Sequence, residues 1–187
     1  LSHTLQCQNT GINYMHDEIR VHVPAPNVIL KTMKILHTSD WHLGRTFHRH
    51  SLHEWHQRFI DELIDYATAE KIDVLLISGD VYDSAHPSAE TTELLGKTLD
   101  RLALAGIQVV LSAGNHDSAR RLGYGAGTLA RQGIYPVTTL KETFEPVELT
   151  RDDIRVRIYA VPYLNPRYYG RQLDVEPTHA AVLGEVC

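Results

Sequence analysis

Three short clusters of acidic and histidine residues follow runs of apolar residues, and their side chains are of the kinds that bind divalent metal ions. The clusters are Ser39-Asp40-Trp41-His42, Gly79-Asp80-Val81-Tyr82-Asp83 and Gly114-Asn115-His116-Asp117. Carboxylate, imidazole and amide groups together suit hard or borderline cations such as Mn²⁺. An aspartate that bridges two such ions is the usual centre of a two-metal hydrolytic site. One cluster alone is compatible with a turn or a helix cap, whereas three together indicate a metal site.

The predicted secondary structure brings the three clusters to one edge of a sheet. Strands that end just before the clusters are expected over residues 34–38, 73–78 and 108–112. Helices are expected between them, one over residues 54–70 and one from a Ser88 cap to about Ala105, with Gly106 just beyond its end. This alternation implies an α/β fold with parallel strands. Ligands of such sheets bind beyond the carboxyl ends of the strands, where all three clusters fall.

The rest of the chain has weaker patterns. A strand is predicted over 134–138, a hairpin over 144–149 and 156–161 with its turn at 150–153, and short helices from near Ser118 and Thr178. Residues 1–32 show no sustained periodicity and contain Pro24-Ala25-Pro26. We therefore expect residues 1–32 to be a disordered or spurious extension, and the ordered domain to cover 33–187.

Composition narrows the class of protein. A chain of 187 residues with 43% hydrophobic content suits one globular domain. No apolar run approaches the roughly 20 residues that span a bilayer, so no membrane association is expected. Cys7 and Cys187, the two cysteines, do not suggest a disulfide framework, which favours the cytoplasm. The net charge of −5 gives no sign of a nucleic-acid binder.

The clusters resemble the motifs of the calcineurin-like metallophosphoesterases, in the segments 37–44, 79–83 and 114–118. The residues around Trp41 and the sequence Val161-Pro162-Tyr163-Leu164 are similar to one branch, the SbcD-type subunits of bacterial SbcCD nucleases. The resemblance covers about residues 33–166. It implies a sandwich of mixed sheets flanked by helices, of which this chain would hold the N-terminal part. It also implies a Mn²⁺-dependent exonuclease and hairpin or single-strand endonuclease of DNA repair and recombination. A coiled-coil ATPase of the SbcC type would be its partner, within a heterotetramer that contains a homodimer of the nuclease subunit.

The same resemblance assigns roles to individual residues. Asp40 and His42 would bind the first metal ion, Asp80 would bridge two ions, and Asn115 would bind the second. His116 would protonate the leaving oxygen or stabilise the charge that develops there. The ions would be Mn²⁺, with Mg²⁺ as the alternative.

Two further acidic residues have open roles. Asp83 either contacts the phosphate region or caps its loop, and Asp117 is expected to orient His116 or hold the loop rather than bind metal.

Basic side chains gather after the first and third clusters. They are Arg45, His48, Arg49, Arg120 and Arg121. They are either contacts to DNA phosphates or solvated loop charges. His50, His53 and His56, at three-residue spacing, are expected on the surface of one helix face, with an adventitious metal site as the alternative.

The sequence departs from the family pattern downstream. The family takes further histidines from a later G-H-x-H motif, which is absent here, and His179 is the only histidine after His116. We therefore expect a partial ligand set, and cleavage by this chain that is slow or absent. Ser84-Ala85 after Asp83 disfavours a protein phosphatase. The alternatives are a nucleotide or cyclic-nucleotide phosphoesterase and an inactive fragment that only binds a partner.

Overall fold

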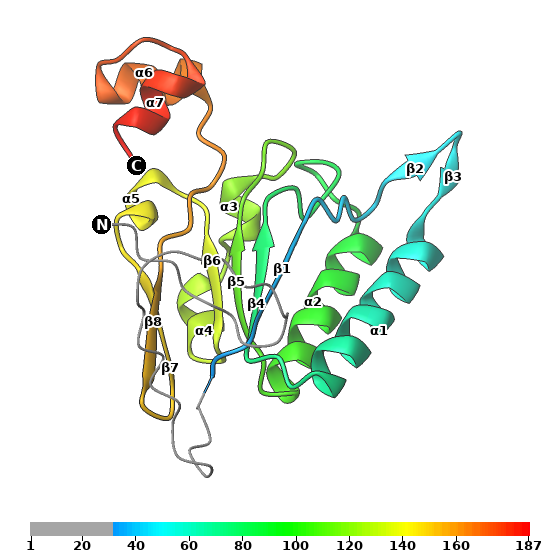
Figure 1. Cartoon of the computed structure of the whole chain (residues 1–187). Helices are drawn as coiled ribbons and strands as arrows, with labels where there is room; N and C mark the ends of the chain where they lie inside the picture. Colours follow the sequence, from blue (N-terminus) through cyan, green and yellow to red (C-terminus); the bar gives the residue numbers. More distant parts are fainter. Residues whose placement is uncertain (1–31) are drawn as a thin grey trace, which may run out of the picture. The chain divides into compact units, whose positions relative to one another are not determined.

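Four parallel strands organise residues 32–187, the part of the chain that this computed structural model describes (Figure 1). They are β1 (Ile35–Ser39), β4 (Val74–Ser78), β5 (Gln108–Ser112) and β6 (Ile134–Val137), in the spatial order β1-β4-β5-β6. The register pairs Ser39 with Ser78, and Ser78 with Ser112. The three loops that carry the clusters therefore leave the sheet side by side. The predicted α/β fold with parallel strands is confirmed.

Helices α1 (His53–Ala69) and α2 (Ala89–Leu104) cover one face of this sheet (Figure 1). Ile60 and Ile64 of α1 and Leu99 of α2 are buried in a core with sheet residues such as Leu75. Burial of each such side chain stabilises the fold by roughly 1.5–3 kcal/mol. The Ser88 hydroxyl accepts a hydrogen bond from the Thr91 N–H at 3.1 Å, which caps α2 as predicted.

The opposite face of the sheet packs against an antiparallel hairpin, β7 (Val147–Arg151) and β8 (Ile154–Ile158). Leu149 is fully buried there with Val74 and Val110. The predicted hairpin is confirmed, but its predicted bounds, 144–149 and 156–161, are wrong. Phe144 instead ends helix α5 (Leu140–Thr143), and the chain after β8 leaves the hairpin, because the Tyr163 N–H bonds the Ala113 carbonyl at the end of β5.

Several short elements complete the fold. They are β2 (Thr46–Phe47), β3 (His50–Ser51), α3 (Ala119–Leu122), α4 (Ala126–Ala130), α6 (Pro166–Leu173) and α7 (His179–Gly184). The helices expected near Ser118 and Thr178 are α3 and α7, whereas β2, β3, α4, α5 and α6 have no counterpart in the sequence-based prediction.

Two expectations from the sequence concern membranes and the N-terminus. Within residues 32–187, the structure contains no helix whose length and apolar character would let it cross a membrane. The extension expected over residues 1–32 lies outside the described residues, apart from the last of them.

Candidate metal centre

The first two cluster loops run beside each other and continue the pairing of β1 with β4. The Asp40 N–H donates to the Gly79 carbonyl at 3.1 Å, and the His42 N–H donates to the Asp80 carbonyl at 2.9 Å. Asp40, His42 and Asp80 have φ angles of 56°, 45° and 46°. A left-handed backbone costs such residues about 1–3 kcal/mol each, and this kind of strain concentrates at functional sites.

The side chains of these loops converge. His42 Nε2 lies 3.9 Å from Asp40 Oδ1 and 3.7 Å from Asp80 Oδ2. One ligand atom each from His42, Asp80 and His116 lies within 4.8 Å of the other two. Imidazole and carboxylate donors this close fit a divalent cation, whose nitrogen and oxygen ligands stand about 2.0–2.3 Å from it. The His42 and Asp80 donors therefore fit a metal ion, and His116, to which the family resemblance gives proton transfer instead of metal binding, lies beside them.

His116 is fixed by two hydrogen bonds from separate parts of the residue. Its backbone N–H donates to Asp80 Oδ1 at 2.9 Å, and its Nδ1 lies 2.9 Å from the Asp83 carbonyl oxygen. Because a carbonyl only accepts, Nδ1 carries the proton and Nε2 is left for other chemistry. The bond to the Asp83 carbonyl raises the pKa of His116, the carboxylates of Asp80 and Asp83 add to the rise, and partial desolvation and the Arg45 charge oppose it.

The Asp83 carboxylate lies beside the other ring nitrogen of His42. Its Oδ1 is 3.1 Å from His42 Nδ1, a buried nitrogen that has no partner in hydrogen-bond geometry among the described residues. Arg45 approaches the same carboxylate at 3.9 Å. Histidines that bind metal through one nitrogen usually have a carboxylate or carbonyl at the other. The position of Asp83 matches that arrangement.

The Asp117 carboxylate joins the second and third loops. It accepts hydrogen bonds from the backbone N–H groups of Val81 at 3.1 Å, Tyr82 at 2.8 Å and Gly114 at 2.8 Å. These contacts occupy both carboxylate oxygens. Asp117 therefore holds the loops that carry Asp80 and His116 in a fixed relation.

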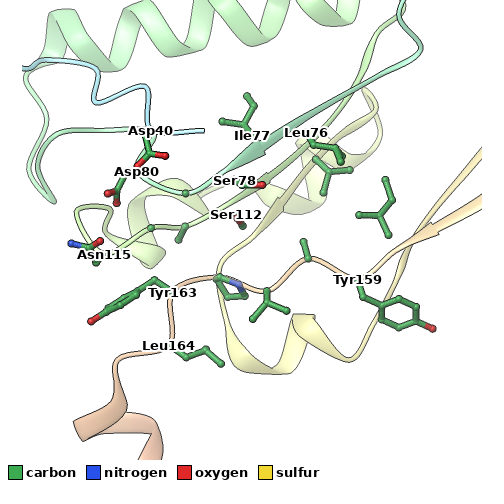
Figure 2. A pocket seen from close by; sticks show the side chains of 18 of the residues that line it. Asp40, Leu76, Ile77, Ser78, Asp80, Ser112, Asn115, Tyr159, Tyr163 and Leu164 are labelled. Carbon is green, nitrogen blue, oxygen red and sulfur yellow. The ribbon is translucent and has the colours of Figure 1, made fainter. Parts of the chain in front are cut away.

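A cavity of about 580 Å³ opens beside the cluster. Asp40, Asp80 and Asn115 line one part of it, and Figure 2 shows these three side chains on one side, with Tyr159 farther along the cavity. Asn115 shares this wall with the two aspartates. Its role as a ligand stays a prediction.

The five basic candidates lie at three different places. Arg45 lies beside the cluster through Asp83. His48 and Arg49 form the turn between β2 and β3, with φ angles of 47° and 67°. Arg120 and Arg121 are exposed on α3. Their contacts with DNA stay a prediction.

His56 is a neighbour of the cluster that the sequence did not indicate. The expectation of surface histidines on one helix face is wrong: His50 is exposed but lies in β3, and His53 and His56 of α1 are half-buried. Burial lowers the pKa of His56, the nearby His53 and His42 lower it further, and the Asp83 carboxylate opposes them. The helical spacing indicated a shared face, but only the packing of α1 against the loops shows that His56 lies near His42.

Comparison with known proteins agrees with this geometry. The family model described as calcineurin-like phosphoesterase matches residues 33–176. A protein named as the SbcD component of nuclease SbcCD, from Staphylococcus saprophyticus, is 35% identical over 157 residues, which cover 82% of this chain and 41% of the relative.

Two more proteins of the same name are similar. The one from Rhodobacter capsulatus is 36% identical, over 71% of this chain and 35% of its own length. The one from Staphylococcus epidermidis is 33% identical, over 70% of this chain and 34% of its own. The chain thus matches well under half the length of these relatives. With most of its residues covered by the family model, the chain belongs to the calcineurin-like phosphoesterase family.

Proposed function

We propose that this protein is a nuclease subunit of the SbcD type, which hydrolyses phosphodiester bonds of DNA with the help of divalent metal ions. The observation that carries the proposal is the convergence of His42, Asp80 and His116 at the strand ends. The three similar proteins are nucleases by name, which indicates nucleic acid as the substrate class.

The proposal assigns Asp40, His42, Asp80 and Asn115 to two Mn²⁺ ions, with Mg²⁺ as the alternative. When bound, such ions polarise a phosphoryl oxygen and lower the pKa of water to near 7. Within the chain, Asp83 orients His42, and Asp117 fixes the loops through three backbone donors.

His116 is assigned to proton transfer. The contact between Nδ1 and the Asp83 carbonyl, which raises the pKa of the ring, leaves Nε2 to donate a proton to the leaving oxygen. Arg45 lies beside the Asp83 carboxylate and is therefore close enough to His116 to hold a phosphate there. His48, Arg49, Arg120 and Arg121 would contact the DNA backbone farther away.

The wider assembly belongs to the same proposal. An ATPase subunit of the SbcC type would be the partner, and two nuclease subunits would pair in the complete complex. The place of action would be the cytoplasm, which the cysteine content favours.

A nucleotide or cyclic-nucleotide phosphoesterase is the second candidate. The cavity of about 580 Å³ beside Asp80 favours it, since this volume lies in the range of small-molecule sites. Both candidates use the same metal centre and differ only in substrate.

The experiment that separates them measures Mn²⁺-dependent cleavage of end-labelled duplex DNA and of a small phosphodiester, bis-p-nitrophenyl phosphate. It uses this chain, and a fusion that continues into the rest of the Staphylococcus saprophyticus relative, each with its His116→Ala variant. DNA cleavage that needs Mn²⁺ and is lost in His116→Ala supports the nuclease. Turnover of the small phosphodiester without DNA cleavage in either protein contradicts it.

A further inference from the structure

Helix α1 carries a row of aromatic side chains on the side that faces solvent. Trp55, Phe59 and Tyr66 are 64%, 39% and 55% exposed. Their spacing of four and seven residues places them within about 40° of one another on a helix that turns about 100° per residue. Ile60 and Ile64 point the other way and are buried in the core. Aromatic side chains gathered on a surface in this way are typical of interaction sites.

Carboxylates accompany these rings. Glu54, Glu62 and Asp65 are exposed on α1, and none of them forms an ion pair with another residue of the described range 32–187. Glu62 lies in the aromatic row, between Phe59 and Tyr66. The surface therefore combines apolar rings with more negative than positive charge.

One cation already occupies this surface in the way that a partner's cation would. Arg58, the only arginine or lysine in α1, places its guanidinium carbon 5.3 Å from the centre of the Trp55 ring. A cation over an aromatic face gains roughly 0.5–1 kcal/mol at exposed sites. The rings of Phe59 and Tyr66 have no such cation among the described residues.

We propose that this face of α1, formed by Trp55, Phe59, Glu62, Asp65 and Tyr66, binds a basic amphipathic segment of a partner protein. Apolar side chains of the segment would cover the rings, and its lysines or arginines would pair with the carboxylates and stack on the exposed ring faces.

The charge of the face disfavours the other occupants. Phosphates of DNA would be repelled by Glu54, Glu62 and Asp65, so the face is not an extension of the proposed nuclease site. A second copy of α1 would bring the same carboxylates together. The inference does not depend on the proposed nuclease activity, because it uses no residue of the metal centre.

The tryptophan fluorescence of the chain can be used to follow this interaction. It has two tryptophans, Trp41, which is 5% exposed, and Trp55, which is 64% exposed. Quenching of fluorescence by acrylamide therefore reports mainly on Trp55. The probe is a synthetic amphipathic helical peptide of leucine and lysine, titrated into the whole chain, and the control peptide has glutamate in place of lysine.

The proposal predicts saturable protection of Trp55 by the lysine peptide and none by the glutamate peptide. The double variant Glu62→Lys/Asp65→Lys should weaken binding at least about tenfold, and Tyr66→Ser should weaken it severalfold. Glu93→Lys/Asp100→Lys on α2 changes the net charge equally and should bind as the unmodified chain does, since these exposed residues lie on another helix.

Three results would overturn the proposal. The first is equal loss of affinity in the α1 and α2 charge variants, which would mean a nonspecific charge effect. The second is protection of Trp55 by the glutamate peptide or by duplex DNA. The third is protection that depends on protein concentration without peptide, which would identify a second copy as the occupant.

Discussion

Gly114 leaves the space that the Asp80 carboxylate occupies. A Cβ atom at position 114 would lie 2.1 Å from both the backbone nitrogen and Oδ1 of Asp80. No side chain larger than hydrogen fits there without moving the residue that lies between His42 and His116. The glycine of the third cluster is thus a steric requirement of the metal centre.

Replacing Gly114 with alanine should therefore displace Asp80. We expect a loss of about 1–3 kcal/mol in the free energy of unfolding, as for other overpacked sites, and loss of measurable Mn²⁺ binding. Urea denaturation and isothermal titration calorimetry test both effects.

Gly96→Ala is the matched control, since its Cβ would meet nothing within 4 Å and it lies in α2. It should stabilise the protein by roughly 0.5–1 kcal/mol. Unchanged metal binding in Gly114→Ala would contradict the steric argument.

The three backbone donors on Asp117 predict a structural penalty for its removal. Asp117→Ala leaves the N–H groups of Val81, Tyr82 and Gly114 without their acceptor. We expect a loss of about 2–4 kcal/mol in unfolding free energy, and a smaller loss in Asp117→Asn, which keeps one acceptor oxygen. Urea denaturation measures this against Asp100→Ala, an exposed aspartate of α2. Equal unfolding free energies of the Asp117→Ala, Asp117→Asn and Asp100→Ala proteins would show that the loops do not need this carboxylate.

Asp83 offers a way to separate orientation of His42 from orientation of His116. The side chain of Asp83 faces His42 Nδ1, whereas its backbone carbonyl holds His116. Asp83→Ala therefore removes the contact with His42, and with it the approach of Arg45, but keeps the carbonyl that holds His116. Metal affinity should fall about 10- to 100-fold, as it does when other carboxylates that orient histidine ligands are removed, with a smaller fall in Asp83→Asn. Calorimetry with Mn²⁺ measures the change. Ser84→Ala, at the next position, serves as control, and an Asp83→Ala protein that binds as tightly as this control contradicts the assignment.

His56 should make the fold sensitive to mild acid. Its pKa is lowered in the folded state, mainly by burial. Between the pKa of the folded state and the ordinary 6.5 of the unfolded chain, the unfolded chain therefore binds more protons than the folded one. Stability is then full above pH 6.5 and decreases as the pH falls through the folded pKa. His56→Gln should reduce the loss of unfolding free energy between pH 7.5 and 5.5, relative to the exposed control His86→Gln. An identical loss in both variants would refute the linkage.

The sequence predicted the elements whose hydrophobic period is regular. Strand β5 (Gln108–Ser112) has the predicted bounds, and α1 and α2 begin and end within one residue of theirs. Burial on both faces of the sheet produces the continuous apolar runs that mark β4 and β5. The same runs locate the second and third clusters, because Gly79 and Gly114 follow the ends of β4 and β5 within two residues.

The short helices and strands were not predicted, because the sequence signals for them extend over only a few residues. Helix α5 begins with a capping box formed by Thr139 and Glu142, and α6 begins with an Asn165 cap followed by Pro166. In the sequence Pro166 indicates the end of a segment, although proline also favours the first turn of a helix. The turn between β2 and β3 places His48 and Arg49 at positive φ, where glycine or asparagine is the usual signal.

The contacts between clusters could not be derived from spacing. The donors Val81 and Tyr82 to Asp117, and the approach of Asp83 to His42, join loops that are far apart in the sequence. Motif resemblance indicates which residues share a site, but only the packed loops show which oxygen faces which nitrogen.

Mn²⁺ binding by this chain and by its Asp80→Asn variant tests the central claim most directly. Asparagine keeps the size of Asp80 and an oxygen for the His116 N–H, but removes the charge at the centre of the cluster. We predict saturable binding by the unmodified chain and by the exposed control Asp100→Asn, and at least about tenfold weaker binding by Asp80→Asn. Equal affinity in all three proteins, or no saturable binding by the unmodified chain, would contradict a metal centre at the strand ends.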